Sequence, residues 1–583
     1  MYYNNIYFEN SLLSILISIF LSLIIISFSL SPVIIKKKQI NFFSNYQPII
    51  LFFLFFLLVT VVFDFLILFK SKEIMKFFFI TFLFLTLLYI LNLKIYKNNQ
   101  KFKNFLDLKD KKLLYLFFLV FFLVSLLPIS DADSIAIHQL LANFIYLNGL
   151  DKINLLKDVE FLSLSNSEIL LIISPILKIE NFGALLNFLS FFLFSLIIYK
   201  KKRNFIYFLI SCPLMIFLVS TQKLQLFFGI LYLVLFILIN EKLIKKKLEI
   251  FIFILLLAFY ASAKINYILF ALPLYIYFLL VNKDQLRLIT YYSLTIFFIV
   301  FCPIFLIKYI YFGNPVAPFF DNLFSSGRDV YESYALSLRS SEGWLLTKSY
   351  QPFLRPFLPT TIYQLSSSFG LLFFLFLINI DLHKKTKFFP ILIILLIIST
   401  GQILPRYYLE AFLILSFYYS TNRISFITNI IKNIQLVFVI GFSTFFLFLA
   451  YLNLNVLKDK TNFLEKFSMT YFNSQQYKKI DLKENILDLS EARTSIFFDN
   501  RIFSTRYLQN QKLLVNKLNS DLLNFIDENS IKYIVTSNES EPILKCLNLE
   551  KIGEILKKTP VRNFLVEIKI YKSYVYKINN LNC

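Results

Sequence analysis

Glycine, alanine and tryptophan are scarce in this sequence, which contains 10 glycines and 1 tryptophan. Phenylalanine, isoleucine, lysine, asparagine and tyrosine are used heavily instead. An AT-rich genome choosing among equivalent apolar and basic residues produces such a bias, so part of the net charge of +23 carries no function. The lysines also collect in short groups between apolar runs, as membrane-flanking residues do. We therefore predict no nucleic-acid partner.

Other signals are also missing. No cleavable signal peptide is expected, because the first apolar run lacks a basic n-region and a small-residue cleavage site. Cys212 and Cys302 lie in or at the ends of apolar runs and are expected to be buried small apolar residues. Cys546 and Cys583 fall in the C-terminal segment, where a disulfide is permitted outside the cytoplasm but cannot be deduced from sequence.

Long apolar runs are the main feature that is present. Hydrophobic residues make up 58% of the chain, and the mean hydropathy is +0.68. Runs of about 18 to 22 residues, each able to cross ~30 Å of hydrocarbon, recur to residue 453, and they predict an all-α polytopic membrane protein with about fourteen transmembrane helices. The predicted spans are 11–35, 48–70, 76–96, 113–129, 167–199 (one long or broken helix), 204–220, 224–240, 248–263, 265–281, 286–310, 361–380, 388–404, 406–420 and 430–453.

The basic residues predict which side of the membrane each loop faces. The N-terminus, the loops 130–166 and 311–360 and everything after residue 453 are expected outside. Lys70, Lys72 and Lys76 would also lie outside and disagree with this assignment. The groups that mark the cytoplasmic side are Lys36–Lys38, Lys97–Lys112, Lys200–Arg203, Lys242–Lys247 and Lys384–Lys387.

Residues 454–583 have shorter aliphatic runs with interspersed charges, and none of these runs is long enough to cross a bilayer. A helix ending in Asp521–Asn529, the strand Ile531–Thr536 and the turn Ser537–Glu541 are predicted, followed by strands at Val566–Ile570 and Val575–Ile578. This pattern indicates a small α/β domain outside the cytoplasm. The segment lacks GxGxxG, GxxxxGK[ST] and CxxC, so it predicts no nucleotide or metal site.

Two acids and a histidine emerge together where the fourth span leaves the membrane. Asp131, Asp133 and His138 lie beside the bilayer, where uncompensated charge is costly and tends to be functional. A helix starting near Asp131 would place Asp131, Ser134 and His138 on one face. A carboxylate there can act as a general base or bind a divalent metal. The alternative is helix capping, with Ser130 or Asp131 as the N-cap and Asp133 in the first turn.

Cations and polar residues are expected on the same outer side. Lys223 closes the span 204–220, and Lys264 lies at the break between the spans 248–263 and 265–281. Gln402, Arg406 and Tyr407 lie where the predicted spans 388–404 and 406–420 meet. Each cation has a simpler explanation as a snorkelling side chain at a helix end. Positive-inside bias should deplete cations on this side, however, so we predict a pocket for a phosphate and a sugar. Arg406 is suited to binding a phosphate with two parallel hydrogen bonds.

These features resemble the GT-C superfamily of integral-membrane glycosyltransferases, over about residues 113–453. The stretch Tyr311–Phe320 is similar to the GNPxxPF loop of bacterial members, and Gln402 with Arg406–Leu409 is similar to their late QxxxRYxxP segment. The acids here are Asp-Ala-Asp rather than adjacent, and no proline follows Tyr408 closely. The resemblance implies additional helices at 1–112, a catalytic core at 113–453 and a periplasmic α/β domain at 454–583 of a bacterial inner-membrane protein.

The resemblance also implies an activity. A sugar carried by a polyprenyl phosphate would be transferred to a glycan, lipid or protein acceptor of the cell envelope, with Asp131, Asp133 and His138 catalytic. Arg406, Lys264, Lys223, Gln402 and Tyr407 would bind the donor. No cofactor is specified beyond a possible divalent metal on Asp131 and Asp133. A polysaccharide polymerase or ligase is an alternative, although 311–360 has no histidine, and a transporter or lipid flippase is another, although no internal repeat is evident.

Overall fold

The computed structural model is mostly helical with a small C-terminal sheet. It describes residues 11–34, 43–92, 112–131, 134–152, 162–317, 324, 368–378, 388–399, 405–420, 425–454, 460–468, 471–473, 475–476, 484–490, 502–504, 520–538, 547–558 and 570–581. Its main helices are α1 (Ser11–Ile34), α2 (Gln47–Leu68), α3 (Lys72–Leu91), α5 (Lys112–Ser125), α6 (Leu140–Asn148), α7 (Asn166–Leu170), α8 (Ile173–Leu177), α9 (Phe182–Ile198), α10 (Arg203–Ile210), α11 (Leu214–Leu218), α12 (Gln225–Asn240), α13 (Lys247–Ala263), α14 (Ile268–Val281), α15 (Leu286–Ile296), α16 (Cys302–Phe312), α19 (Leu371–Ile378), α20 (Phe388–Ser399), α21 (Leu409–Tyr419), α22 (Phe426–Asn453), α23 (Thr461–Phe467) and α26 (Ser520–Glu528).

The described helices support a multi-pass membrane protein. By length and apolar composition, 5 helices can cross a membrane, or up to 6 if a bent pair counts as one span. This is fewer than the sequence predicts. Several predicted spans correspond instead to apolar helices of 10–17 residues, which are Lys112–Ser125, Gln225–Asn240, Ile265–Val281 and Phe389–Ser399.

Breaks account for part of the difference, because a hydropathy window averages over them. The predicted span 167–199 is two segments, Asn166–Leu177 and Phe182–Ile198, bent by 113°. The predicted span 204–220 divides into α10 and α11, with Cys212 and Pro213 between them. Proline lacks the N–H that a continuous helix needs, so the chain turns there. Conversely, 286–310 is part of one continuous helical span, Lys283–Phe312.

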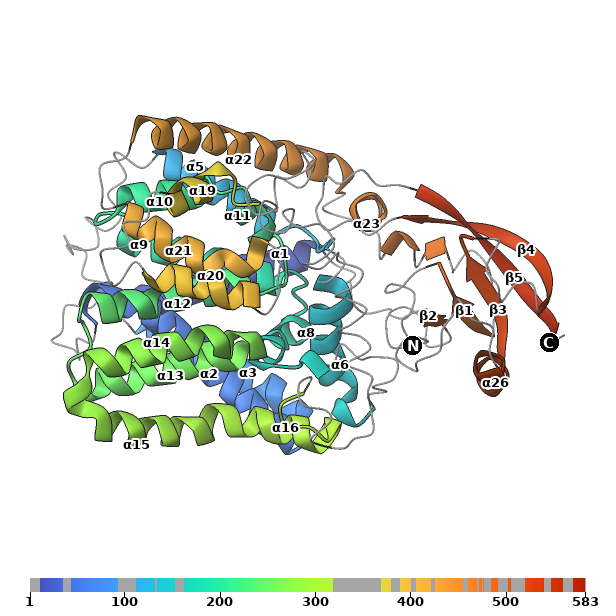
Figure 1. The fold of residues 1–583 in the computed structure, drawn as a ribbon, viewed down its shortest axis with the longest axis horizontal. Coiled ribbons are helices and arrows are strands. Elements are labelled where there is room, and N and C mark those ends of the chain that lie inside the picture. The colour runs from blue at the N-terminus through green and yellow to red at the C-terminus, as the bar shows by residue number, and fades with distance from the viewer. Residues whose placement is uncertain are drawn as a thin grey trace.

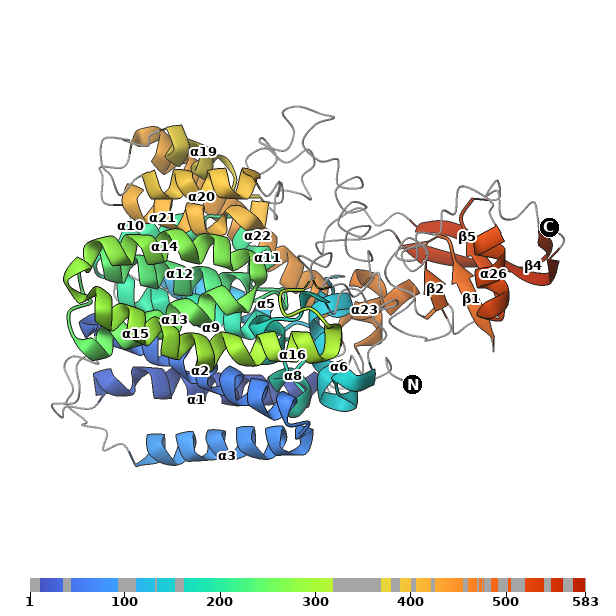
Figure 2. The same cartoon turned by 60° about the horizontal axis from the view of Figure 1, so that its bottom comes forward.

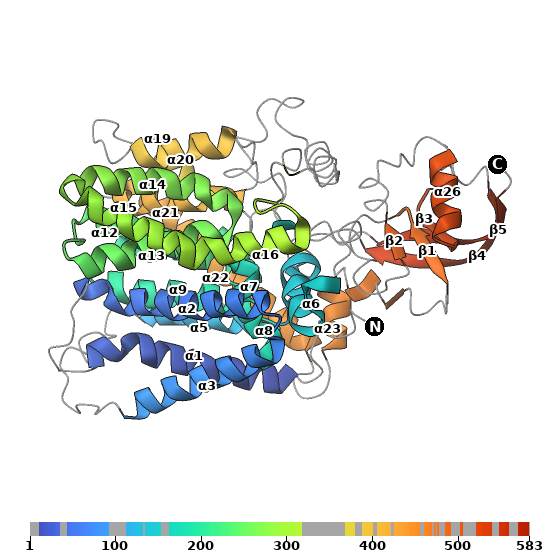
Figure 3. The ribbon, with the colours of Figure 1, turned by 90° about the horizontal axis from the view of Figure 1, so that it is seen from below.

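The helices form one bundle with the C-terminal sheet beyond one of its ends (Figure 1). The helices α6 and α23 lie at that same end. Two turned views agree and place α3 along one side of the bundle and α19 and α20 along the opposite side (Figures 2 and 3). The helix α12 runs through the interior, with residues 225–239 buried.

The two ends of the bundle differ in their charged groups. Lys201 Nζ lies 3.6 Å from Glu241 Oε2, which brings two predicted cytoplasmic groups of lysines to one end. Lys223 precedes α12 and Glu241 follows it, and a helix of this length separates its ends by about 24 Å. Lys70, which disagreed with the predicted sidedness, lies 3.0 Å from Asp151 of the predicted outer loop. A hydrogen bond to this carboxylate raises the pKa of Lys70, so the lysine stays charged.

The C-terminal domain contains a mixed five-stranded sheet in the order β2-β1-β3-β5-β4. The parallel strands are β1 (Asn485–Asp488), β2 (Ile502–Ser504) and β3 (Ile531–Thr536), whereas β5 (Ile570–Leu581) is antiparallel to β3 and to β4 (Leu547–Lys558). The predicted strand 531–536 is confirmed, and α26 covers the sheet through Leu522, Phe525 and Ile526. The sequence did not predict β4, because its outward positions carry many charges. Cys546 and Cys583 lie outside the described residues.

Candidate functional site

Asp131 caps the helical segment that follows it. It accepts hydrogen bonds through Oδ2 from the backbone N–H of Ser134 at 3.0 Å and from Ser134 Oγ at 2.8 Å. This is the capping role that the sequence left open. The segment Ser134–Gln139 is a π-helix, η2, and it continues into α6. π-Helical turns are rare and occur frequently at functional sites.

A cation from another part of the chain also contacts Asp131. Lys223 Nζ lies 3.5 Å from Asp131 Oδ2, and both side chains are 6% exposed. A buried carboxylate requires such a partner, because removing an unpaired charge from water is costly. The other oxygen, Asp131 Oδ1, is buried with no hydrogen-bond partner among the described residues. The acid therefore combines a cap and an ion pair with one buried oxygen that has no hydrogen-bond partner among the described residues.

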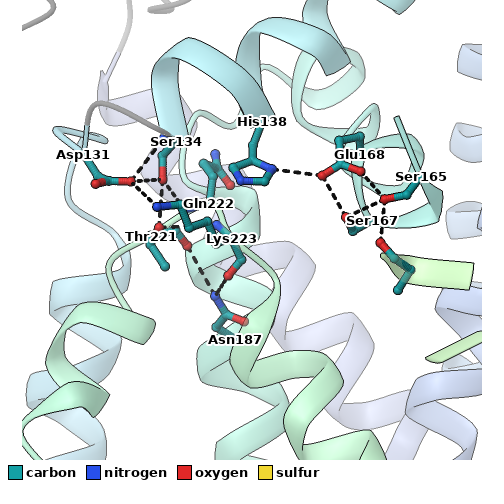
Figure 4. Close-up of polar contacts among 11 residues, drawn as sticks. Asp131, Ser134, His138, Ser165, Ser167, Glu168, Asn187, Thr221, Gln222 and Lys223 are labelled. Carbon is teal, nitrogen blue, oxygen red and sulfur yellow. Dashed lines mark hydrogen bonds and ion pairs between the residues drawn. The ribbon is translucent and has the colours of Figure 1, made fainter. Parts of the chain in front are cut away.

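The turn that carries Lys223 is held by hydrogen bonds from two directions. Asn187 of α9 donates through Nδ2 to the carbonyl oxygens of Leu218 at 2.9 Å and Lys223 at 2.7 Å. On the other side, Ser134 Oγ lies 2.8 Å from Thr221 Oγ1 and accepts from the Gln222 N–H at 3.0 Å. These contacts fix the turn against η2, so the Asp131–Lys223 pair is set by buried, directional bonds (Figure 4).

His138 contacts a different acid. Its Nδ1 lies 3.0 Å from Glu168 Oε1, at the start of α7. Ser167 Oγ donates to the same oxygen at 2.8 Å, and Ser165 Oγ contacts Glu168 Oε2. Figure 4 shows the His138 side chain directed to this group, on the side of η2 away from Asp131. The sequence predicted that Asp131, Ser134 and His138 share one helix face. Asp131 and Ser134 are hydrogen-bonded to each other, but His138 points away from them and pairs with Glu168.

Lys264, Arg406 and Tyr407 form a second group of predicted residues. Lys264 lies in the extended break between α13 and the turn Ile265–Tyr267 (η5), and its Nζ is 5.4 Å from the centre of the Tyr407 ring. Arg406 and Tyr407 belong to the turn Pro405–Tyr408 (η10) before α21. Arg406 Cζ lies 5.5 Å from the centre of the same ring. Two of the three predicted cations therefore lie beside one phenol.

A network of side-chain amides joins the acid site to the bend before α9. Gln222 donates through Nε2 to Gln139 Oε1 at 3.0 Å and also contacts the carbonyl oxygen of Glu180. Gln222 Oε1 accepts from the Gly183 N–H. Lys460, which follows the last bundle helix, forms an ion pair with the Glu180 carboxylate.

Asp133 and Gln402 lie outside the described residues, so their predicted roles stay predictions. Among the residues that the structure describes, no three histidine, cysteine, aspartate or glutamate side chains gather as a metal site would require. Lys223 already occupies the Oδ2 side of Asp131, and its ammonium would repel a divalent ion held there.

Sequence reasoning missed Glu168 and Glu410. Glu168 begins an apolar segment, and Glu410 follows Arg406 and Tyr407 in another, where Tyr260 Oη donates to its Oε1 at 3.1 Å. Both acids are almost fully buried. Each was detectable as an ionisable residue within a hydrophobic run, which is a functional signal in itself.

The chain matches no protein-family model, no curated protein and no solved structure. The resemblance to the GT-C superfamily therefore stays a prediction.

Proposed function

We propose that this protein is a membrane glycosyltransferase that moves a sugar from a polyprenyl-phosphate donor to a cell-envelope acceptor. The observations that carry the proposal are the ion pair of Asp131 with Lys223 and the two cations, Lys264 and Arg406, beside the Tyr407 ring. Cations are expected to be depleted at an outer membrane face, so one cation on Asp131 and two beside Tyr407 indicate an anionic ligand. A lipid-linked phosphate supplies such an anion within the membrane.

The chemistry of transfer requires few groups. The acceptor hydroxyl attacks the anomeric carbon, and the bond from that carbon to the phosphate oxygen breaks. The phosphate leaves with the electron pair and is already charged, so it needs fixed positive charge more than a proton. Arg406 and Lys264 supply that charge, and Asp131 Oδ1 accepts a hydrogen bond from the attacking hydroxyl.

The proposal includes the finer architecture that the resemblance implies. In this proposal the short helices complete a GT-C-like bundle of about fourteen crossings, since broken or irregular backbone is tolerated at membrane depth where it is buried in protein. The lysines near Lys201 and Lys242 face the cytoplasm. The acid site and the C-terminal sheet then share the periplasmic side of a bacterial inner membrane.

The test is transfer from radiolabelled polyprenyl-phosphate sugars by the purified protein in liposomes. Asp131→Asn should lower turnover by about 10²-fold while the protein still inserts and folds, because the attacking hydroxyl loses the carboxylate that orients it. Asp151→Asn is the matched control, because Asp151 is an exposed acid and its ion pair among the described residues is with the exposed Lys70. Normal transfer by Asp131→Asn would mean that Asp131 serves only as a helix cap, and it would reject the proposal. Lipid-phosphate movement without sugar transfer would favour a flippase.

A further inference from the structure

The pair of His138 and Glu168 has the geometry of a base held in one orientation. Both residues lie on segments at the end of the bundle that carries Asp131, and Glu168 is fixed from several sides. Ser165 Oγ lies 2.5 Å from the carbonyl oxygen of Ala263, so the serine that contacts Glu168 is itself tied to the end of α13. Asn166 donates to Ser262 Oγ at 2.9 Å and fixes the start of α7 to the same helix.

This arrangement selects one protonation form of the neutral imidazole. An ionised carboxylate only accepts hydrogen bonds, so Nδ1 must carry the proton that it shares with Glu168. The other ring nitrogen, Nε2, is then a lone-pair acceptor. Among the described residues His138 has no second hydrogen bond, and its side chain is 15% exposed, so a ligand can reach Nε2.

Asp131 is less suited to accept a proton. The ammonium of Lys223 lies 3.5 Å from its Oδ2, and two donors of Ser134 bind the same oxygen. These three groups already surround Oδ2, so that oxygen has no free position at which to take up the proton of the acceptor. Asp131 is therefore equipped to orient a hydroxyl, whereas His138 is equipped to take its proton.

We infer that His138 Nε2 accepts the proton of the acceptor hydroxyl and that Glu168 is a positioning residue that holds His138 for this task. The inference rests on the proposed transferase function. As the acceptor oxygen bonds to the anomeric carbon, its proton moves to Nε2, and the bond from carbon to phosphate oxygen breaks with its electrons on the phosphate. No further reactant is needed. Glu168 keeps its charge throughout and stabilises the imidazolium that forms.

The chain offers a direct spectroscopic test because it contains only 2 histidines, His138 and His383. With His383→Gln and ¹⁵N-labelled histidine in proteoliposomes, the imidazole signals report on His138 alone. We expect the neutral ring to carry its proton on Nδ1, and we expect Glu168→Ala to shift the proton toward Nε2. An unchanged tautomer in Glu168→Ala would overturn the inference, and this measurement needs no enzyme activity.

Kinetics provide the second readout. His138→Gln should lower turnover by ~10²–10⁴-fold, and Glu168→Gln should lower it at least tenfold with unchanged binding of a polyprenyl monophosphate. The double variant should be no slower than His138→Gln, because residues that act as a unit give non-additive losses. Additive losses would overturn the inference and leave the proposed function standing on Asp131. Absence of transfer by the unmodified protein would instead reject the proposed function and, with it, this proton role.

Discussion

Lys460, the described residue that immediately precedes α23, forms a buried ion pair with Glu180 in the bend before α9. Glu180 also accepts through its carbonyl oxygen from Gln222, whose backbone N–H bonds Ser134 beside Asp131. The segment that leads to the C-terminal domain is thus joined to the candidate site by consecutive polar contacts. The next helix, α23, packs on the membrane bundle through Phe463 and Phe467.

Removing one partner of this pair should destabilise the protein strongly. Lys460→Met leaves Glu180 buried beside an apolar side chain, and breaking a buried pair in this way costs about 3–5 kcal/mol. Thermal unfolding in detergent should show the loss, whereas Lys466→Met, an exposed lysine of α23, is the control. Combining Lys460→Met with Glu180→Gln should recover part of the stability. No recovery in the double variant would mean that the two side chains are not coupled.

Arg406 should be the cation that receives the lipid phosphate. Its guanidinium presents paired donors that lysine cannot copy, so Arg406→Lys should keep the charge yet weaken binding of a polyprenyl monophosphate and lose much activity. Arg406→Ala should lose more, because the leaving phosphate would lack a fixed counter-charge. Lys223→Ala and Lys264→Ala are measured beside them. If both arginine variants bind the polyprenyl monophosphate with unchanged affinity and a lysine variant binds it more weakly, that lysine and not Arg406 receives the phosphate.

Gly183 should tolerate no side chain. A Cβ atom there would lie 2.3 Å from Gln222 Oε1 and 2.5 Å from the Gln222 carbonyl oxygen. Gly183→Ala should therefore push the turn that carries Lys223 away from α9, cost about 1–3 kcal/mol of stability and lower transfer. Gly441→Ala is the matched control, since nothing lies within 4 Å of its Cβ position, and alanine should stabilise α22 by about 0.5–1 kcal/mol. Equal effects of both substitutions on the unfolding temperature would refute this account.

The two ends of the bundle should face opposite sides of the membrane. In a variant without native cysteines, Asp151→Cys should react with a membrane-impermeant maleimide from outside the cell. Lys201→Cys should react only after permeabilisation, because in the unmodified protein Lys201 pairs with Glu241 at the other end of the bundle. Labelling of both positions from one side would remove the basis for an outer site.

Local patterns were enough to predict several elements. Alternating residues bounded by turn formers predicted the strand Ile531–Thr536, and the apolar run before residue 453 predicted α22. These elements depend on periodicity and turn chemistry, which neighbouring residues determine. The number of crossings was not predictable in the same way. A break such as Cys212–Pro213 leaves average hydropathy almost unchanged although the helix ends there.

The sequence by itself determined that the chain is a multi-span helical membrane protein with a small α/β domain after it, and that Asp131, Lys223, Lys264 and Arg406 lie between α-helices. Hydropathy and charge can be read along the chain, because apolar runs enter the bilayer and charged segments stay in water. Only the tertiary structure decided which side chains meet. Lys223 reaches Asp131 because Asn187 of α9 holds its turn, and His138 reaches Glu168 because α7 is tied to α13. Such pairings depend on how distant segments pack, and one-dimensional patterns carry no record of that.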